Sequence, residues 1–350
     1  MSEIPKAPDL SSPPAAAATL HDVAQAAGVS LATASRVLNG STRRVAETYR
    51  ERVQAAADRL GYTANLSAQA TARGTSAIVA LLVADIADPY FGQIAAGVAR
   101  GADEAGLVVT IAITERDPAR EVRVIRALRG QRPRGLILAA SRDLDHDAVG
   151  LSGELSALSA SGTRAVALGR GDGDVRWLAV DNHAGASALA SQMSALGYRR
   201  AIVLAAAEGL RTSDDRIAGF TEGFTAGGGQ QPRVLRGSFS RQGGIDLMTR
   251  VLEEGVEPGT LVFGISDVVA IGAMRAIRDA GRSVGADIAV CGFDDIPTSS
   301  DVTPALTTVR VPLDEIGYQA LHAAVTDDWS GPGDAVELTV IPRDSTPGRS

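Results

Sequence analysis

The strongest constraint on the fold is an alternation of short apolar runs and amphipathic segments that begins near residue 77. Helical spacing of apolar residues marks segments near 90–105, 119–130, 147–160, 183–196, 214–227, 241–254 and 267–280. Apolar strands that alternate with helices are typical of parallel sheets covered on both faces. The strand-like runs themselves occupy residues 77–84, 107–113, 134–140, 164–168, 177–180, 200–206, 260–265 and 287–291.

This alternating part of the chain is too long for one doubly wound domain. Two later strand-like runs, 306–311 and 335–341, flank a helical segment at about 313–326. The whole stretch is about 270 residues, beyond the size at which a single hydrophobic core stops growing. We therefore predict an α/β core over 76–345 with two lobes. The first lobe takes in about 76–169 and 296–328, and the second about 170–295 and 329–345.

Composition excludes several classes of protein. The single cysteine, Cys291, rules out a disulfide scaffold. No apolar run approaches the ~20 residues that a membrane-spanning helix needs. Residues 1–18 contain four prolines and no apolar core of a secretory signal, so we expect a flexible tail. We expect a cytoplasmic protein that makes no contact with a membrane.

The formal net charge of −7 is unevenly spread. Residues 19–75 contain seven arginines against four acidic residues, a net charge of +3, which leaves −9 on residues 76–350. Such asymmetry predicts a small nucleic-acid-binding module joined to a larger acidic body.

Residues 20–39, LHDVAQAAGVSLATASRVLN, have the spacing of a helix-turn-helix. Thr19 and Asp22 form a capping-box pattern that can begin the first helix. Gly28 suits a left-handed turn, and Ser30 can cap the second helix. An ordinary amphipathic hairpin is the alternative, but all of these positions fall in register within a basic segment, which favours DNA binding.

A third amphipathic segment, 47–60, completes this small all-α domain. It is predicted to bring Val53, Ala57 and Leu60 against the two short helices. The predicted core positions on those helices are Val23, Ala24, Ala27, Ala34, Val37 and Leu38.

The segment TLHDVAQAAGVSLATASRVLNG resembles the N-terminal signature of the LacI/GalR family of bacterial transcription regulators. The resemblance continues through RERVQAAADRLGY, DIADPYF, RIAGF, SDVVAIGAMRAI, ADIAVCGFDD and PALTTVRVP, and covers roughly residues 19–343. It implies a DNA-binding domain at 19–62, a hinge at 63–75 and a core like periplasmic sugar-binding proteins. It also implies a homodimer on a pseudo-palindromic operator.

The resemblance assigns DNA contacts by position. In this family the second helix enters the major groove, which puts Leu31, Ala32 and Arg36 at base-reading positions. Arg36 can contact guanine O6 and N7 together, whereas the other two offer apolar contact. Arg43 and Arg44 either attract phosphates or are solvated. Positions that touch phosphates in the family are occupied here by Thr19, Ser30, Thr33, Ser35 and Asn39.

The hinge departs from the family pattern. The family's Tyr-x-Pro-Asn reads Tyr62-Thr63-Ala64-Asn65 here, and Asn65 keeps its DNA-contacting position. Thr71 stands where the family has a leucine that wedges into the minor groove and kinks the DNA. We therefore predict a less stable hinge helix and weaker bending.

Candidate effector-binding residues either follow strand-like runs, where ligands bind in open α/β sheets, or match ligand-binding positions of the family, as the resemblance implies for Arg216, Phe239 and Asp294. They are Asp88, Tyr90, Phe91, Arg170, Arg216, Phe239, Ser266, Asp267 and Asp294. Carboxylates, an arginine and aromatic rings suit a polyhydroxy ligand such as a sugar, sugar alcohol or nucleoside.

Four of these assignments have structural alternatives. Tyr90 and Phe91 could pack the lobe, Arg216 could pair with Asp214 or Asp215 on the surface, and Asp267 could cap the helix that follows it.

The chain is thus interpreted as an effector-controlled DNA-binding regulator, a repressor, and not an enzyme. A transport-system binding protein is the second hypothesis, and a nucleotide-using α/β enzyme is the third. No phosphate-binding loop or catalytic cluster supports the enzyme, so no cofactor is expected. The four histidines lack metal-like spacing, so no metal is expected either.

Overall fold

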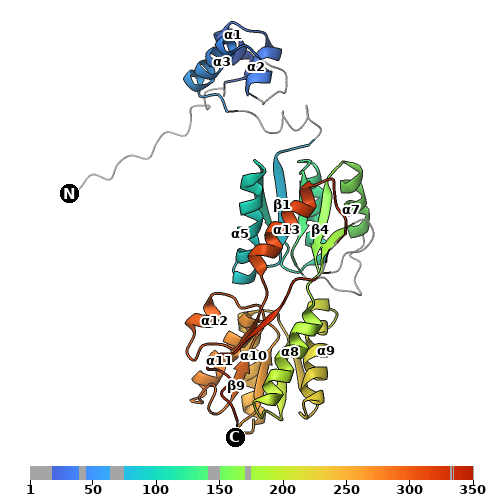
Figure 1. The fold of residues 1–350 in the computed structure, drawn as a ribbon, viewed down its shortest axis with the longest axis vertical. Helices are drawn as coiled ribbons and strands as arrows, with labels where there is room; N and C mark the ends of the chain where they lie inside the picture. The colour runs from blue at the N-terminus through green and yellow to red at the C-terminus, as the bar shows by residue number, and fades with distance from the viewer. Residues whose placement is uncertain are drawn as a thin grey trace, which may run out of the picture. The chain divides into compact units, whose positions relative to one another are not determined.

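The computed structural model describes residues 18–38, 45–63, 75–140, 150–169, 175–331, 333 and 335–349. The chain divides into two compact units, Met1–Ser76 and Ala77–Ser350 (Figure 1). Among the described residues, every helix is too short or too polar to span a bilayer.

The first unit contains α1 (Leu20–Ala27), α2 (Leu31–Leu38) and α3 (Glu47–Leu60). The predicted capping box is confirmed: Asp22 N–H donates to the Thr19 hydroxyl, and Thr19 N–H donates to the Asp22 carboxylate. Gly28 ends α1 with φ 61°, the left-handed conformation that the tight turn requires. A side chain there would also meet Arg52 Nη2 at 2.6 Å. The two short helices are therefore set at a fixed angle by local chemistry.

The core of this unit is built from small residues. One predicted member is wrong: Leu60 is 38% exposed, because it ends α3 one turn beyond the alanines that pack inward. Ala56 takes part instead. The buried side chains are Val23, Ala24, Ala27, Ala34, Val53, Ala56 and Ala57.

The first lobe of the second unit is a parallel sheet in the order β2-β1-β3-β4-β5. Alternate residues of β1 face opposite ways: Leu81 contributes to the core that includes α5 and α13, and Leu82 to the core that includes α6 and α7. The sheet is thereby covered on both faces. Its elements are β1 (Ile78–Val83), α5 (Pro89–Glu104), β2 (Val108–Ile113), α6 (Pro118–Arg129), β3 (Gly135–Leu138), α7 (Leu151–Ala160), β4 (Arg164–Leu168), β5 (Arg176–Leu178) and α13 (Leu313–Val325).

The second lobe is a parallel sheet in the order β7-β6-β8-β9. The pair α8–α9 and the pair α10–α11 cover its two sides (Figure 1). An antiparallel pair, β10 and β11, lies beside it. The elements are α8 (Asn182–Ala195), β6 (Ala201–Ala206), α9 (Arg211–Ala226), β7 (Arg233–Gly237), α10 (Arg241–Glu254), β8 (Leu261–Gly264), α11 (Asp267–Asp279), β9 (Ala289–Cys291), α12 (Thr298–Asp301), β10 (Thr308–Arg310) and β11 (Thr339–Ile341).

The lobe boundaries differ from those expected. Strand β5 pairs with β4, so the first lobe extends through Leu178 rather than ending at 169. The stretch that begins at Ile296 belongs to the second lobe, because Ile296 N–H and the Ser299 hydroxyl both donate to the carboxylate of Asp267 on α11.

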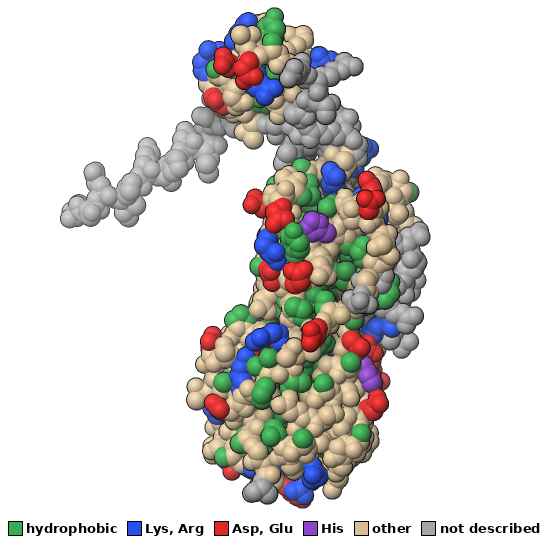
Figure 2. Space-filling view, in the orientation of Figure 1, with side chains coloured by type: hydrophobic (Ala, Val, Ile, Leu, Met, Phe, Trp, Pro, Cys, Tyr) green, Lys and Arg blue, Asp and Glu red, His purple; other side chains and the backbone are tan. Residues whose placement is uncertain are grey.

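The chain passes between the lobes three times: after β5, before α13 and after α13 (Figure 1). On the face drawn in Figure 2, hydrophobic side chains gather where the lobes meet, and charged side chains are scattered over both lobes. This junction is where a ligand could be enclosed.

Candidate functional site

The exposed face of α2 is the candidate DNA-binding surface. Leu31 is 50% exposed although it is a large apolar residue, and Ala32 and Arg36 are exposed beside it, while Ala34 points into the core. Arg36 makes no hydrogen bond or ion pair with any other described residue. An apolar side chain and an uncommitted arginine on one helix suit the edges of base pairs.

The hydroxyl groups near this face cap the helices. Ser30 Oγ accepts the N–H of Thr33 at 3.1 Å and lies 2.8 Å from the Thr33 hydroxyl. The Thr19 hydroxyl donates to Asp22 at 2.7 Å, and hydrogen bonds from Thr19, its backbone N–H first, lower the pKa of Asp22. Ser35 is half-buried. Asn39, Arg43, Arg44, Asn65 and Thr71 lie outside the described residues.

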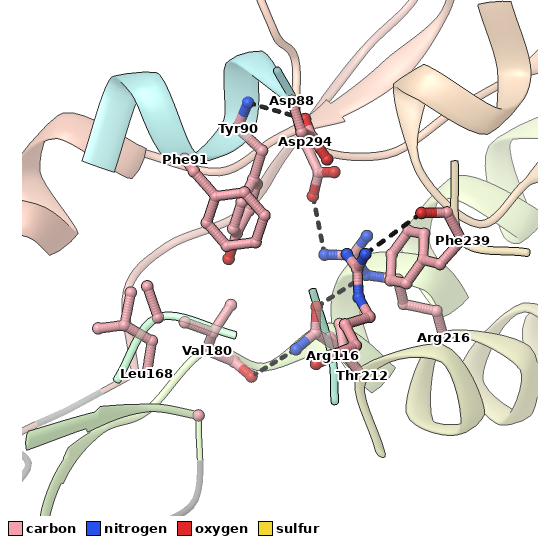
Figure 3. A pocket seen from close by; sticks show the side chains of 13 residues that line it. Asp88, Tyr90, Phe91, Arg116, Leu168, Val180, Thr212, Arg216, Phe239 and Asp294 are labelled. Atoms are coloured by element: carbon pink, nitrogen blue, oxygen red, sulfur yellow. Dashed lines mark hydrogen bonds and ion pairs between the residues drawn. The ribbon is translucent and has the colours of Figure 1, made fainter. Parts of the chain in front are cut away.

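A cleft of about 560 Å³, counting the space open at its mouth, lies between the two lobes (Figure 3). Figure 3 shows Tyr90 and Phe91 on one side, and Arg216 and Phe239 on the other. Most of its lining follows the carboxyl ends of strands, as expected for this class of sheet. The lining residues are Asp88, Tyr90, Phe91, Arg116, Ala139, Leu168, Gly169, Val180, Asn182, Thr212, Arg216, Phe239 and Asp294.

Arg216 on α9 is the centre of the second-lobe wall. Its Nε donates to Asn182 Oδ1, its Nη1 to the carbonyl of Ile265 and its Nη2 to Asp294 Oδ1, each at 2.8 Å. The guanidinium also lies 3.8 Å from the centroid of the Phe293 ring. Three of the five N–H groups are thus used, which leaves two for a ligand. The alternative of a surface pair with Asp214 or Asp215 is wrong.

Asp294 lies three residues after the end of β9, with φ 116°. Burial raises its pKa to about 7, although the Arg216 guanidinium pulls the pKa down. Only Oδ1 is engaged by the described residues, so Oδ2 can accept a hydroxyl.

On the first-lobe side, Asp88 caps α5 by accepting the Tyr90 N–H at 3.0 Å, and burial raises the pKa of its carboxyl. The Tyr90 and Phe91 rings meet edge to face at 5.0 Å. Phe91 is only 3% exposed, so it packs in the core of the lobe and also lines the cleft.

Two predicted residues lie away from the cleft. Asp267 is fully buried, and it neither lines the cleft nor caps α11, whose first residue it is. Its carboxylate accepts hydrogen bonds from Ile296 N–H, Ser299 and Thr308, which holds the chain after β9 to the second lobe. Ser266 is 2% exposed, and its hydroxyl has no hydrogen-bond partner within the described part of the chain. Arg170 is outside the described residues.

The sequence analysis missed Arg116 and Asn182. Arg116 lies shortly after the end of β2, and Asn182 shortly after the end of β5. A search of the residues after every strand would have found both. Each of the two walls thus carries hydrogen-bonding side chains and at least one flat aromatic ring. This arrangement can hold a small ring-shaped molecule with several hydroxyls.

Comparison with known proteins supports both halves of this description. The family described as bacterial regulatory proteins, lacI family, matches residues 19–65, and the periplasmic binding protein-like domain matches residues 190–346. The regulator GalR of Escherichia coli is 31% identical over 312 residues, 88% of each chain. The lactose operon repressor of the same organism is 33% identical over 296 residues, 83% of this chain and 79% of the relative.

Solved structures agree across nearly the whole chain. The Lac repressor dimer bound to operator and the anti-inducer ONPF has a TM-score of 0.78 at 28% identity and covers 94% of this chain and 99% of its own. The transcriptional regulator CelR in complex with cellobiose has a TM-score of 0.67, with the same identity and coverage. The relatives are transcription regulators rather than enzymes. This chain belongs to the LacI family of DNA-binding transcription regulators.

Proposed function

We propose that this regulator is a cytoplasmic repressor that binds a pseudo-palindromic operator as a homodimer and responds to a small polyhydroxy effector. The proposed effector class rests on the buried Arg216–Asp294 pair at the cleft wall. This pair leaves N–H groups and a carboxylate oxygen for ligand hydroxyls. A hydroxyl that donates to a carboxylate and accepts from a guanidinium is held at both of its polar functions.

The proposed domains are a tail at 1–18, a DNA-binding domain at 19–62, a hinge at 63–75 and the effector-binding core at 76–345. On the DNA side, Arg36 reads a guanine and Leu31 and Ala32 contact apolar base edges. The phosphate contacts come from Thr19, Ser30, Thr33, Ser35, Asn39, Arg43, Arg44 and Asn65, with Thr71 near the central base step.

On the effector side, Arg216, Asp294 and Asp88 hold hydroxyl groups, and the Tyr90 and Phe239 rings lie against apolar parts of the ligand. The operator-bound Lac repressor dimer and the cellobiose complex of CelR support this proposal by likeness. Because the ligand contacts both lobes, its binding alters the angle between them and hence the DNA-binding geometry of the dimer.

The test combines operator selection with ligand titration on the full-length protein. Selected duplexes are expected to contain an inverted repeat, with binding that weakens steeply as salt rises. Titration of sugars, sugar alcohols and nucleosides is then expected to shift operator affinity by at least about fivefold for one of them. A protein that selects no sequence, or whose operator affinity responds only to compounds without hydroxyls, would overturn the proposal.

A further inference from the structure

The cleft contains a second arginine, Arg116, which the first lobe supplies from the loop after β2. Both Glu115 and Arg116 have left-handed backbone conformations, with φ 55° and 56°, which are unfavourable for side chains of this size. Thr114 and Glu115 N–H groups donate to the carbonyls of Val83 and Ala84 and hold the loop in this shape. Backbone strain of this kind persists where the surrounding structure imposes it, commonly at ligand-binding positions.

The described residues supply few hydrogen-bond partners for the Arg116 guanidinium. Its Nη1 donates to the carbonyl of Phe239 at 3.4 Å, a long hydrogen bond, and its Cζ lies 4.6 Å from the centroid of the Phe239 ring. Its Nε is buried and has no hydrogen-bond partner among the residues that the structure describes. Among the described residues, no carboxylate forms an ion pair with it, in contrast to Arg216 in the same cleft.

Nearby carboxylates attract Arg116 without forming an ion pair with it: burial lowers the Arg116 pKa, and the charges of Asp88 and Asp85 offset only part of that effect. Asp294 is committed to Arg216, and one oxygen of Asp88 accepts the N–H of Tyr90. Burial raises the pKa of both carboxyls, to about 7 for Asp294, so Asp294 carries less negative charge than an exposed carboxylate at neutral pH. Burial of a guanidinium without an equal counter-charge is unfavourable, and an anion from solution would relieve it.

We propose that the effector carries an oxyanion, a carboxylate or a phosphate, beside its hydroxyl groups, and that Arg116 binds this group. The planar guanidinium, laid on the flat Phe239 ring, presents a pair of N–H donors with the geometry that carboxylates and phosphates accept. The effector class becomes sugar acids or sugar phosphates. This inference rests on the proposed function, because it refines the ligand of the same cleft.

The first experiment uses inorganic phosphate as the probe, at constant ionic strength against sodium chloride. Saturating phosphate is expected to raise the Tm of the full-length protein by about 2–4 °C. Arg116→Gln is expected to abolish the rise, and Arg116→Lys to keep part of it. Arg275→Gln removes an exposed arginine on α11 and is the matched control, expected to respond like the wild type. An equal rise in wild type and Arg116→Gln, or no rise in the wild type, overturns the proposal.

The second experiment compares glucose, gluconate and glucose 6-phosphate by calorimetric titration, which separates a carboxylate from a phosphate. At least one acidic member is expected to bind about tenfold more tightly than glucose, and Arg116→Gln to remove that preference. Glucose binding as tightly as both acids overturns the proposal. If none of the three compounds binds, the effect of inorganic phosphate on the Tm of the wild type and of Arg116→Gln decides whether Arg116 binds an oxyanion. A phosphate response through Arg116 without binding of any of the three compounds would support the oxyanion site at Arg116 and count against the polyhydroxy effector of the proposed function.

Discussion

Arg216 Nη2 donates to Asp294 Oδ1 at 2.8 Å, and the side chains of the two residues are only 3% and 6% exposed. The pair joins α9 to the chain after β9, two parts of the second lobe far apart in sequence. Because both charges are out of water, each depends on the other for compensation.

Replacement of Arg216 by Gln is therefore expected to lower the free energy of unfolding by about 3–5 kcal/mol, since Asp294 is left buried without its partner. The double variant Arg216→Gln/Asp294→Asn removes both charges and is expected to recover part of this loss. Chemical denaturation measures both variants. A double variant no more stable than the single one would contradict an interaction between these two residues.

Replacement of Arg36 by Ala is expected to weaken binding to the selected operator by about 1–3 kcal/mol and to relax preference at one base pair. Fluorescence anisotropy measures the affinity on matched and mutated duplexes. Arg59→Ala removes an exposed arginine from α3 and controls for loss of charge alone. If both variants lose affinity equally on every duplex, Arg36 contributes charge and not sequence reading.

Asp267 predicts a specific pH dependence. Burial, with the Asp294 charge adding to it, raises the Asp267 pKa to about 8 in the folded protein. In the unfolded chain the carboxyl ionises near pH 4, so the unfolded state binds fewer protons between these values and stability falls as pH rises. The unfolding free energy of the wild type minus that of Asp267→Asn should decrease from pH 4 to pH 8, by up to about 1.4 kcal/mol per pH unit. A difference that does not change with pH would exclude the shift.

Gly317 predicts a steric limit between α13 and α5. A Cβ at this position would lie 2.1 Å from the carbonyl oxygen of Ile94, and the helices would have to separate. Gly317→Ala is expected to destabilise the core by about 1–3 kcal/mol or more. Gly153 on α7 has open space around it, so Gly153→Ala is expected to be neutral or slightly stabilising. Equal effects of the two substitutions on thermal unfolding would argue against the close helix contact.

Thr71 supplies a prediction from the sequence pattern alone. Thr71→Leu restores the apolar wedge of the family and is expected to increase both operator affinity and the DNA bend angle. Energy transfer between dyes at the two ends of the duplex reports the bend. A Thr71→Ser variant controls for altered packing and should bend DNA no more than the wild type. An unchanged angle in Thr71→Leu would mean that this position does not reach the base step.

Sequence patterns predicted most of the architecture because the strong signals are local. Capping by Thr19 and Ser30 and the apolar runs of β1, β3 and β6 depend on neighbouring residues only. Strand β7 was missed because it lies at the sheet edge: its sequence RVLRG includes two arginines, and only Leu235 is buried. Edge strands need little apolar patterning.

The sequence predicted which residues lie near the cleft, but not the direction in which each side chain points. Asp88 and Asp294 follow strand ends, Arg216 lies within α9 at a position that the family resemblance assigned, and all three line the cleft. Asp267 also follows a strand, but its partners, Ile296, Ser299 and Thr308, are 29 to 41 residues away along the chain. Those long-range hydrogen bonds turn its side chain away from the cleft, and no local pattern encodes them. The predicted lobe boundary at residue 296 is wrong for the same reason, because hydrogen bonds to the distant Asp267 hold this stretch to the second lobe.

The position of α13 has a consequence for how the protein is made. The sheet of the first lobe is complete at Leu178, but the helix that covers one of its faces beside α5 begins only at Leu313. A ribosome adding about 5–20 residues per second needs on the order of ten seconds to synthesise the chain between them. During that interval α5 is already present on this face, but the apolar surface beside it that α13 covers stays exposed. The first lobe therefore becomes native only after nearly the whole second lobe has been synthesised.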